Sequence, residues 1–423
     1  MKIAVIGAGI IGITTAYELA VDGHEVTVFE RRSAAAEETS FANAGVVAPG
    51  SVTPWAAPGM PGKVLGNLLS RHSAVKLSLP LSGVDLAWMW KWWRACKLQT
   101  YLTNRARLQR LAFYSRERLH QLTDSLQLEY DRSEGYTVLL RSDKDSRMVQ
   151  PGLQVLRDAG VAFTEINAEA VRKLEPAINP DTDFLGGIHL PHDEVANCRQ
   201  FALLLKDVAR DLGVKFEFNT AVVQLKQEQT ANLLIAGEST PRQFDQVVMC
   251  AGLASSALLK PLGLKIPMVA VYGYSISAPI HEPLNAPRSA LMDERYKVAI
   301  SRLGSRVRVA GSAELGGSLS KHRASSVQTL YKVLHDWFPV ATKHSNSHPN
   351  LGASVQLWKG ARPMLPDGPP IIGYSGIAGL WLNLGHGSSG WALSCGSARA
   401  LADVMSGRAA DIDMDGLGLD RLG

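Results

Sequence analysis

The first thirty residues contain a strand, a glycine turn, a helix and a second strand in immediate succession. Residues 3–6 are an apolar run, typical of a parallel strand buried on both faces. The glycine-rich segment 7–12, GAGIIG, follows at once, and residues 13–20 predict a helix. A second apolar strand over residues 25–29 ends at Glu30. This order of elements predicts a βαβ unit that binds a dinucleotide.

Each glycine of the turn has a separate physical role. Gly7 permits the tight turn, Gly9 lets the backbone approach a pyrophosphate, and Gly12 allows the helix to pack closely on the strand. The phosphates are expected at the helix N-terminus, where free N–H groups and the helix dipole favour anions. Glu30 is expected to bind ribose hydroxyls and to repel a 2′-phosphate, which disfavours NADP. A secretory signal peptide explains the same apolar run less completely.

The chain after Glu30 favours FAD over NAD. Residues 38–45, ETSFANAG, are mostly small, hydroxyl or amide residues, which suit a chain running along an extended dinucleotide. A bare NAD-binding unit would continue into further βα repeats, whereas this chain enters a loop rich in proline and glycine. The apolar segment 246–252 ends in glycine and follows an expected β-meander over residues 215–244. This interrupted layout predicts a dinucleotide domain built from separated pieces of chain.

A second glycine turn lies near the C-terminus. Residues 385–391, GHGSSGW, follow a predicted strand over 380–384 and open a predicted helix that runs to about Met405. A helix N-terminus here would favour partial negative charge, such as the N1–C2=O edge of a reduced flavin. The alternative is an ordinary loop, which the N-terminal glycine turn makes the weaker interpretation.

Composition and missing motifs exclude several classes of protein. The 423 residues allow two or three domains, and 20% charged residues is an ordinary globular share. A formal net charge of +5 is too mild for a nucleic-acid binder, and no binding motif accompanies it. The sequence has no GxSxG and no GxxxxGK[ST] motif, which excludes a serine hydrolase of that type and a P-loop NTPase. The uncharged stretches 39–62 and 368–398 are interrupted by proline and glycine, so neither predicts a membrane-spanning helix.

Cysteine and histidine spacing predicts neither a disulfide framework nor a metal site. The four cysteines are widely separated and form no CxxC pair, which favours a reducing compartment: Cys96, Cys198, Cys250 and Cys395. The closest histidine pairs, His189 with His192 and His344 with His348, have no HExxH frame and no nearby ligand cysteine. We therefore expect no bound metal.

Six stretches resemble the D-amino acid oxidase-like FAD-dependent oxidoreductases, and among them most closely the bacterial D-amino acid dehydrogenases. The resemblance runs nearly from end to end, and the stretches are EETSFANAG (37–45), PWAAPG (54–59), LGVKFEFNT (212–220), GYS (273–275), GARPMLPDGPPIIG (360–373) and LWLNLGHGSSGW (380–391). The chain departs from these relatives at Tyr272, where they tend to have lysine, and at Ser388-Ser389, where many have Thr-Leu. Both departures fall in segments expected to line the substrate side, so they bear on side-chain preference.

The resemblance implies an α/β chain (α+β overall) of two domains. A Rossmann-like FAD-binding domain is expected over residues 1–85, 150–255 and 350–423. A substrate-binding domain with an antiparallel sheet is expected over the insertions 86–149 and 256–349. The FAD would be bound non-covalently. The positions that match the family's FAD contacts are Gly7, Gly9, Ile11, Gly12, Glu30, Arg31, Ser40, Asn43, Ala44, Gly45, Val222, Ala251, Gly252, Gly385, Gly387, Ser388, Ser389 and Gly390.

Three residues are implied in catalysis. Arg362 matches the arginine that binds the substrate carboxylate, a task for which the planar guanidinium fork is suited. The backbone carbonyl of Ser388 matches the acceptor for the substrate amine. Tyr272 and Tyr274 lie in a predicted strand, and only one of them is expected to face the site because strand side chains alternate. Tyr274 is the better family match, and the alternative for it is a core tyrosine.

The implied reaction is the oxidation of a D-amino acid. A hydride would pass from Cα to flavin N5, and water would hydrolyse the imino acid to a 2-oxo acid and ammonia. The electrons would go to a respiratory-chain quinone or another acceptor that is not oxygen. The alternatives are an oxidase of amino acids or secondary amines that reduces oxygen, and a flavin-binding sensor without catalysis.

The basic segment 63–118 is the remaining feature. It holds eleven Lys or Arg and two Asp or Glu, and residues 85–97 carry four of the nine tryptophans. Lys91, Arg94 and Lys97 recur at every third residue, near one helical face, so such a helix can lie in the interface of an anionic membrane. The competing interpretation, slightly favoured, packs the tryptophans into the core. We expect a cytoplasmic protein. Because the dehydrogenase relatives are membrane-associated, peripheral contact with the inner face of the cell membrane is an open alternative.

Overall fold

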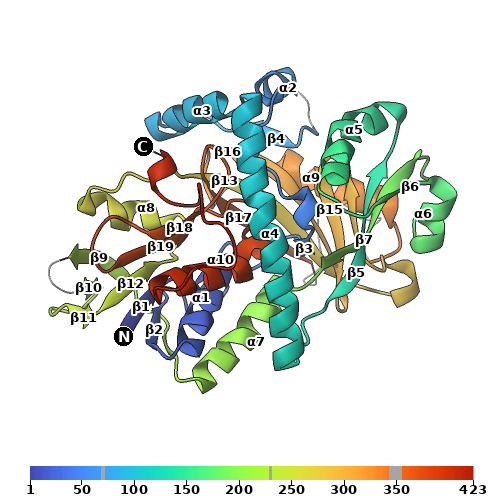
Figure 1. The fold of residues 1–423 in the computed structure, drawn as a ribbon. Coiled ribbons are helices and arrows are strands. Elements are labelled where there is room, and N and C mark those ends of the chain that lie inside the picture. The colour runs from blue at the N-terminus through green and yellow to red at the C-terminus, as the bar shows by residue number, and fades with distance from the viewer. Residues whose placement is uncertain (68–71, 228–230, 343–354, 423) are drawn as a thin grey trace.

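In the described chain two large sheets are joined by a long helix, and a third, small sheet packs on one of them (Figure 1). The computed structural model describes residues 1–67, 72–227, 231–342 and 355–422. His344, His348 and the first residues of the expected segment 350–423 therefore lie outside the described residues. Within the described chain, no helix is long and apolar enough to cross a membrane, and no cluster of three ligand side chains could hold a metal.

The first sheet has six strands in the order β18–β19–β12–β1–β2–β8. The pairs from β19 to β8 are parallel, and β18 is antiparallel to β19. The strands are β1 (Lys2–Ile6), β2 (Glu25–Phe29), β8 (Lys215–Glu217), β12 (Gln246–Met249), β18 (Ile371–Tyr374) and β19 (Leu380–Leu384). The strands predicted at 3–6, 25–29, 246–252 and 380–384 are therefore confirmed, although the third ends earlier. Their apolar residues are buried because helices and a small sheet cover both faces.

Helices cover one face of this sheet, and a three-stranded antiparallel sheet covers the other. The helices are α1 (Ile10–Val21), α7 (Cys198–Asp211) and α10 (Gly390–Met405), which packs against the 29-residue α4 (Leu98–Leu126). The small sheet comprises β9 (Val222–Gln227), β10 (Ala231–Ile235) and β11 (Arg242–Phe244), next to α8 (Ala254–Leu259). The predicted meander is thus correct except at its start, because residues 215–217 join the parallel sheet beside β2.

The second sheet follows the order β17–β13–β16–β15–β14–β5–β7–β3, with β4 paired to β16 and β6 to β7. Its pairs are antiparallel apart from β5–β14 and β4–β16, which are parallel. The strands are β3 (Val46–Val47), β4 (Val75–Leu77), β5 (Ser133–Leu140), β6 (Thr164–Asn167), β7 (Gly186–Val195), β13 (Val269–Pro279), β14 (Ala290–Asp293), β15 (Val298–Leu303), β16 (Arg306–Leu315) and β17 (Gln356–Met364).

The chain crosses between the sheets at places that differ from the expected domain boundaries. β3 and β4 fall inside the expected FAD segment 1–85, β6 and β7 inside 150–255, and β17 inside 350–423, yet all five belong to the second sheet. An apolar strand pattern does not reveal which sheet will pair with it, so the sequence could not place these crossings. The remaining helices lie around the second sheet: α2 (Met60–Asn67), α3 (Gly83–Ala95), α5 (Asp143–Asp158), α6 (Ala168–Leu174) and α9 (Ala324–Trp337).

Candidate functional site

The N-terminal glycine turn is built so that one of its glycines faces open space. Gly7 has φ +103°, and a Cβ there would lie 2.8 Å from the carbonyl oxygen of Cys250. A Cβ on Gly12 would lie 1.8 Å from the carbonyl oxygen of Gly7, so the packing of β1, β12 and α1 requires both glycines. At Gly9 the nearest atom to a Cβ is the Ser40 hydroxyl, 3.4 Å away. Gly9 is therefore not needed by the chain's own packing, which fits a backbone that a dinucleotide approaches.

Glu30 and Ser40 both bind the glycine turn. The Ala8 N–H donates to Glu30 Oε2 at 2.8 Å, and the Ile10 N–H donates to Ser40 Oγ at 3.0 Å. The N–H groups of Ile11 and Gly12 follow in the first turn of α1, where no intrahelical acceptor is available. The predicted acid, hydroxyl and helix N-terminus thus lie together, as a phosphate and ribose site requires.

Arg31 is a predicted FAD contact whose side chain forms an ion pair. Its guanidinium forms a bidentate ion pair with Glu38, with nitrogen–oxygen distances of 2.6 to 2.9 Å, and Glu38 also accepts from Arg32. Both partners of the Arg31–Glu38 pair are about half exposed. An exposed pair of this kind contributes little to stability, so it can rearrange when a ligand binds.

The segment 42–44 is held from the second sheet. The carbonyl of Ala42 accepts from Ser275 Oγ at 2.9 Å, and the carbonyl of Ala44 accepts from Ser301 Oγ at 2.7 Å. Between them, the carbonyl of Asn43 accepts from the buried Arg308 guanidinium at 3.1 Å. Gly45, which follows at φ +78°, accepts at its carbonyl from the Trp391 indole of α10 at 3.2 Å. The predicted contacts from Asn43 to Gly45 therefore lie where the second sheet and α10 meet.

The second glycine turn is fastened to the end of β17. A Cβ on Gly385 (φ +80°) would meet Leu365 at 2.5 Å, and one on Gly387 (φ +57°) would meet the Met364 sulfur at 2.7 Å. The Gly387 N–H also donates to the Pro363 carbonyl at 3.1 Å. Helix α10 then begins at Gly390, as predicted. The remaining predicted contacts, Ala251 and Gly252, follow β12 beside the end of β1, and Val222 begins β9.

Arg362 is a partly buried cation that forms no ion pair with a carboxylate in the described chain. One of its terminal nitrogens donates to the Ser312 carbonyl at 2.9 Å, and its guanidinium lies 5.8 Å from the Trp55 ring centre. Burial lowers the pKa of Arg362 to about 10, and no acidic side chain in the described chain forms an ion pair with it. A buried unpaired charge is costly, and an anion that binds beside it offsets much of that cost. The geometry therefore suits a carboxylate ligand.

A hollow beside Arg362 contains no charged lining residue. It is lined by Thr53, Pro54, Trp55, Leu108, Met364, Gly368, His386, Gly387, Ser388 and Ser389. Trp55 connects it to the Arg362 guanidinium, and Ser388 lies on its exposed rim. The Gly387 N–H donates to the carbonyl of Pro363, the neighbour of Arg362, and Ser388 lines the hollow, so the structure brings the chain segments of both predicted residues together at the N-terminus of α10.

Two lining residues, Trp55 and His386, were not singled out from the sequence. Both lie within stretches that carried the resemblance, so their position in PWAAPG and GHGSSGW was the available signal. Burial lowers the pKa of His386 to about 3, so its imidazole is neutral at physiological pH, and its Nε2 lies 3.1 Å from Ser397 Oγ. A neutral imidazole adds a polar group to the hollow without adding charge.

Tyr274 lies on the other face of β13. In the register of β13 with β17, Arg362 is opposite Val271, while Tyr274 is opposite Lys359. The tyrosine is 1% exposed, its hydroxyl donates to Glu314, and it packs in the core beneath α9. The structure therefore separates Tyr274 from Arg362 and Ser388.

The expectation that only one of Tyr272 and Tyr274 faces the site was wrong. Residues two apart on a strand share a face. The ammonium of Lys359 lies 4.5 Å from the Tyr272 ring centre and 5.1 Å from that of Tyr274. Lys359 is itself buried and ion-paired with Glu314 at 2.9 Å. The two tyrosines thus flank one structural ion pair.

The fold and the two glycine turns define a dinucleotide-binding oxidoreductase. Residues 2–404 match the model of the family described as FAD dependent oxidoreductase, and the chain belongs to that family. FAD is accordingly its cofactor, and the open backbone at Gly9 with the free N–H groups of α1 fits it.

The similar proteins agree with this class. The chain is 40% identical over 423 residues to a D-amino acid dehydrogenase of Bradyrhizobium diazoefficiens, covering 100% of this chain and 99% of that protein. It is 39% identical to a D-amino acid dehydrogenase of Vibrio atlanticus, with both chains covered completely. Glycine oxidase from Geobacillus kaustophilus has the same fold, with a TM-score of 0.73 at 19% identity over 99% of this chain and 98% of that one. L-proline dehydrogenase from P. horikoshii also has it, with a TM-score of 0.73 at 15% identity over 100% and 97%.

Proposed function

We propose that this chain oxidises D-amino acids to 2-oxo acids and ammonia and passes the electrons to an acceptor other than oxygen. The observation that carries the proposal is the partly buried guanidinium of Arg362, which forms no ion pair in the described chain and lies near an uncharged hollow. Full-length similarity of about 40% to proteins named D-amino acid dehydrogenase supports the choice of substrate.

Four groups at or near the hollow have definite tasks in this reaction. Arg362 binds the substrate carboxylate through its guanidinium fork. The exposed Ser388 carbonyl accepts a hydrogen bond from the substrate amine, which orients Cα between the two anchors. Trp55 and Met364 exclude water from the guanidinium, which strengthens its attraction for the carboxylate. FAD, when bound, supplies the acceptor for the hydride.

Anaerobic reduction of the flavin tests this function directly. D-amino acids mixed with the holoenzyme should bleach the flavin band near ~450 nm, whereas the matching L-amino acids should not. If no amino acid bleaches the flavin, the protein is a sensor and not an enzyme. Bleaching followed by rapid reoxidation in air, with hydrogen peroxide formed stoichiometrically, would identify an oxygen-using oxidase instead.

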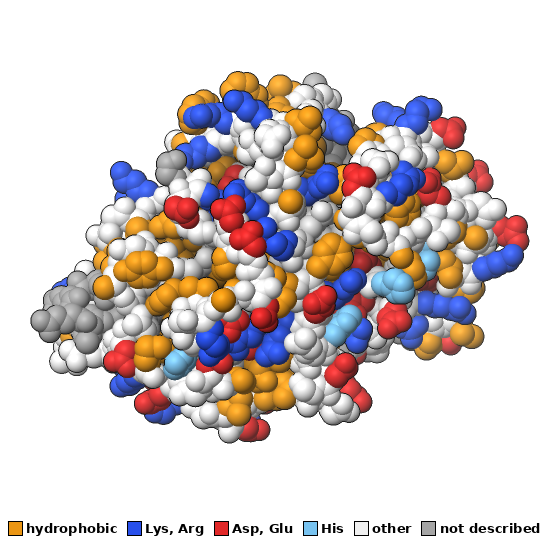
Figure 2. All heavy atoms as spheres, viewed as in Figure 1, with side chains coloured by type: hydrophobic (Ala, Val, Ile, Leu, Met, Phe, Trp, Pro, Cys, Tyr) orange, Lys and Arg blue, Asp and Glu red, His pale blue; other side chains and the backbone are white. Residues whose placement is uncertain are grey.

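We also propose that α3 and the chain around it contact an anionic membrane, from which a quinone accepts the electrons. Exposed apolar side chains gather here, and we call them, with the exposed Lys91, Arg94 and Lys97, the α3 surface: Leu65, Leu79, Val84, Leu86, Trp90, Trp93 and Leu98. Trp90 and Trp93 are 54% and 60% exposed, and Arg94 stacks on the Trp90 ring at 4.7 Å. Figure 2 shows hydrophobic and basic side chains interleaved along the top of the molecule, where Figure 1 places α2 and α3.

Of the four tryptophans of α3, two pack into the core and two are exposed, so the core and membrane interpretations each hold for one pair. Trp88 is buried, and its indole donates to the Met364 carbonyl at 2.9 Å. Trp92 packs partly buried beside it, so these two anchor α3 to the second sheet. Trp90 and Trp93 point away from that core. Lys97 lies beyond the end of α3 at Ala95 and is the N-cap residue of α4. The three cations therefore do not share one helix, contrary to the prediction.

A further inference from the structure

We propose that Gly273 and the irregular turn of β16 at Ser312 position the Arg362 guanidinium for its carboxylate. The inference rests on the carboxylate role given to Arg362 above. It concerns two residues that touch the arginine rather than the substrate, so they are positioning residues. The evidence is the contact between Arg362 and each of the three groups that surround it.

The backbone of Gly273 forms the floor under the guanidinium. Arg362 is opposite Val271 in the β13–β17 register, so its side chain runs along the strand face that Gly273 shares. A Cβ on Gly273 would lie 2.3, 2.6 and 2.8 Å from three guanidinium atoms of Arg362. Gly273 is not among the glycines with positive φ, so the backbone conformation does not require glycine there. The present position of the Arg362 guanidinium does, because a Cβ on Gly273 would displace it.

Ser312 holds one edge of the guanidinium. It has φ +60° in β16, where the register with β13 shifts between Tyr272 and Tyr274. Such a bulge turns a carbonyl out of the regular ladder. The carbonyl of Ser312 accepts a hydrogen bond from Arg362 at 2.9 Å, and within the described residues it is the guanidinium's hydrogen-bond acceptor.

These contacts leave the rest of the guanidinium fork available. One face lies on Gly273, the Trp55 ring lies 5.8 Å away, and one nitrogen is held by Ser312. A guanidinium has five N–H donors, so several remain for a carboxylate. Fixing the fork before the substrate arrives reduces the ordering that binding requires. The bulge and the missing Cβ therefore preorganise the carboxylate site.

The test is a double-mutant cycle with Gly273→Ala and Arg362→Ala in the FAD-loaded enzyme, assayed with D-alanine and a soluble dye acceptor. Because a Cβ on Gly273 would push the guanidinium from its place, we expect Gly273→Ala to raise KM with a smaller change in kcat, and to lower kcat/KM on the order of 10- to 100-fold, as a displacement of about 1 Å can. In the Arg362→Ala background, Gly273→Ala should lower kcat/KM no further. Titration with propanoate, followed by the flavin spectrum, should show the same pattern without turnover. Gly152→Ala is the control, since a Cβ there has no atom within 4 Å.

The outcomes separate this inference from the proposed function. Unchanged KM in Gly273→Ala, or losses that add in the double variant, would overturn the positioning role while leaving Arg362 in place. Wild-type kcat/KM in Arg362→Ala would overturn the carboxylate assignment and the positioning role together. If Gly273→Ala does not fold, folding of the double variant supports the clash with Arg362. Failure of both to fold would show that β13 itself needs the glycine.

Discussion

At the scale of single residues, Arg362 is the group on which the chemistry depends most. We expect Arg362→Ala to fold and to retain FAD, because the arginine forms no ion pair with an acid in the described chain. Losing a charge-assisted contact to the carboxylate should cost about 2–5 kcal/mol, roughly 30-fold or more in kcat/KM. Arg362→Lys should recover only part of this, because a point charge cannot reproduce the planar fork. Steady-state kinetics with D-alanine measure both, and a value for Arg362→Ala within a few-fold of wild type contradicts the assignment.

The two glycines of the first turn should respond differently to valine. At Gly9 the surroundings are open, so Gly9→Val should fold with a nearly unchanged Tm for the FAD-free protein but fail to retain FAD. At Gly12 a Cβ would collide with the Gly7 carbonyl, so Gly12→Val should lower the Tm sharply or prevent folding. Thermal unfolding and the flavin-to-protein absorbance ratio distinguish the two. Gly9→Val purified with stoichiometric FAD would refute the cofactor site.

At the scale of elements, the α3 surface makes a prediction about membranes. Changing Lys91, Arg94 and Lys97 together to alanine should weaken binding to anionic vesicles by roughly 3 kcal/mol, at about 1 kcal/mol for each charge. That is about a hundredfold in Kd, and added salt should release the wild type as well. Activity with a soluble dye should survive, whereas reduction of membrane quinone should fall.

A second triple variant, which removes three positive charges elsewhere on the surface, controls for the change in net charge. Lys173, Arg210 and Lys215 are exposed cations on α6, α7 and β8, and Figure 1 places α6 and α7 away from α2 and α3, so their change to alanine should leave vesicle binding intact. Equal weakening in both triple variants would indicate a general charge effect. No vesicle binding by the wild type would show that the α3 surface has another partner or none.

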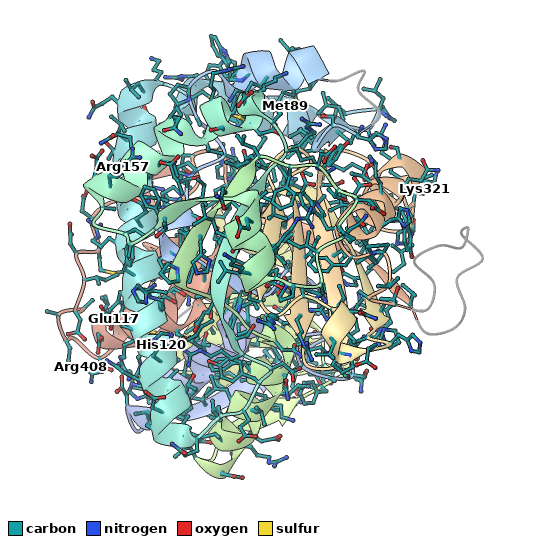
Figure 3. The ribbon with its side chains drawn as sticks, turned by 90° about the vertical axis from the view of Figure 1, so that its right-hand side faces the viewer. Met89, Glu117, His120, Arg157, Lys321 and Arg408 are labelled. Atoms are coloured by element: carbon teal, nitrogen blue, oxygen red, sulfur yellow. The ribbon has the colours of Figure 1, made fainter. Side chains whose placement is uncertain are left out.

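At the scale of the whole molecule, α4 joins the two sheets and brings charges to their junction. Figure 3 shows α4 along one edge of the molecule, with Glu117 and His120 labelled on it. Its Arg116 lies 3.6 Å from Asp193, and His120 contacts Glu194 at 3.2 Å, both acids at the end of β7. Burial raises the pKa of Asp193 to about 7 despite Arg116, and one of its oxygens is buried with no hydrogen-bond partner among the described residues.

This acid should make stability depend on pH. Because the folded protein holds the Asp193 proton more tightly than the unfolded chain, this group's contribution to stability falls as pH rises from about 4 to about 7. Asp193→Asn removes that dependence. The Tm difference between Asp193→Asn and wild type should therefore shift in favour of the variant between pH 5 and pH 8. Equal Tm differences at both pH values would show that Asp193 is not protonated in this range.

The sequence by itself determined the local parts of this protein. The strand, glycine turn and helix at each end of the chain were predicted nearly to the residue, because apolar runs, glycine turns and free helix N-termini are properties of neighbouring residues. The identity of Arg362 as the carboxylate candidate also came from the sequence, through its Gly-x-Arg-Pro context and the resemblance.

Only the tertiary structure decided which residues share a face or a space. Tyr274 and Arg362 lie on opposite faces of the β13–β17 pair, and this depends on a register that the strand sequence does not contain. Trp88 and Trp90 lie on one helix, yet one is buried and one exposed because of what packs against α3. The floor that Gly273 provides for Arg362 joins residues 89 positions apart. Such contacts arise from long-range pairing and packing, which local propensity does not specify.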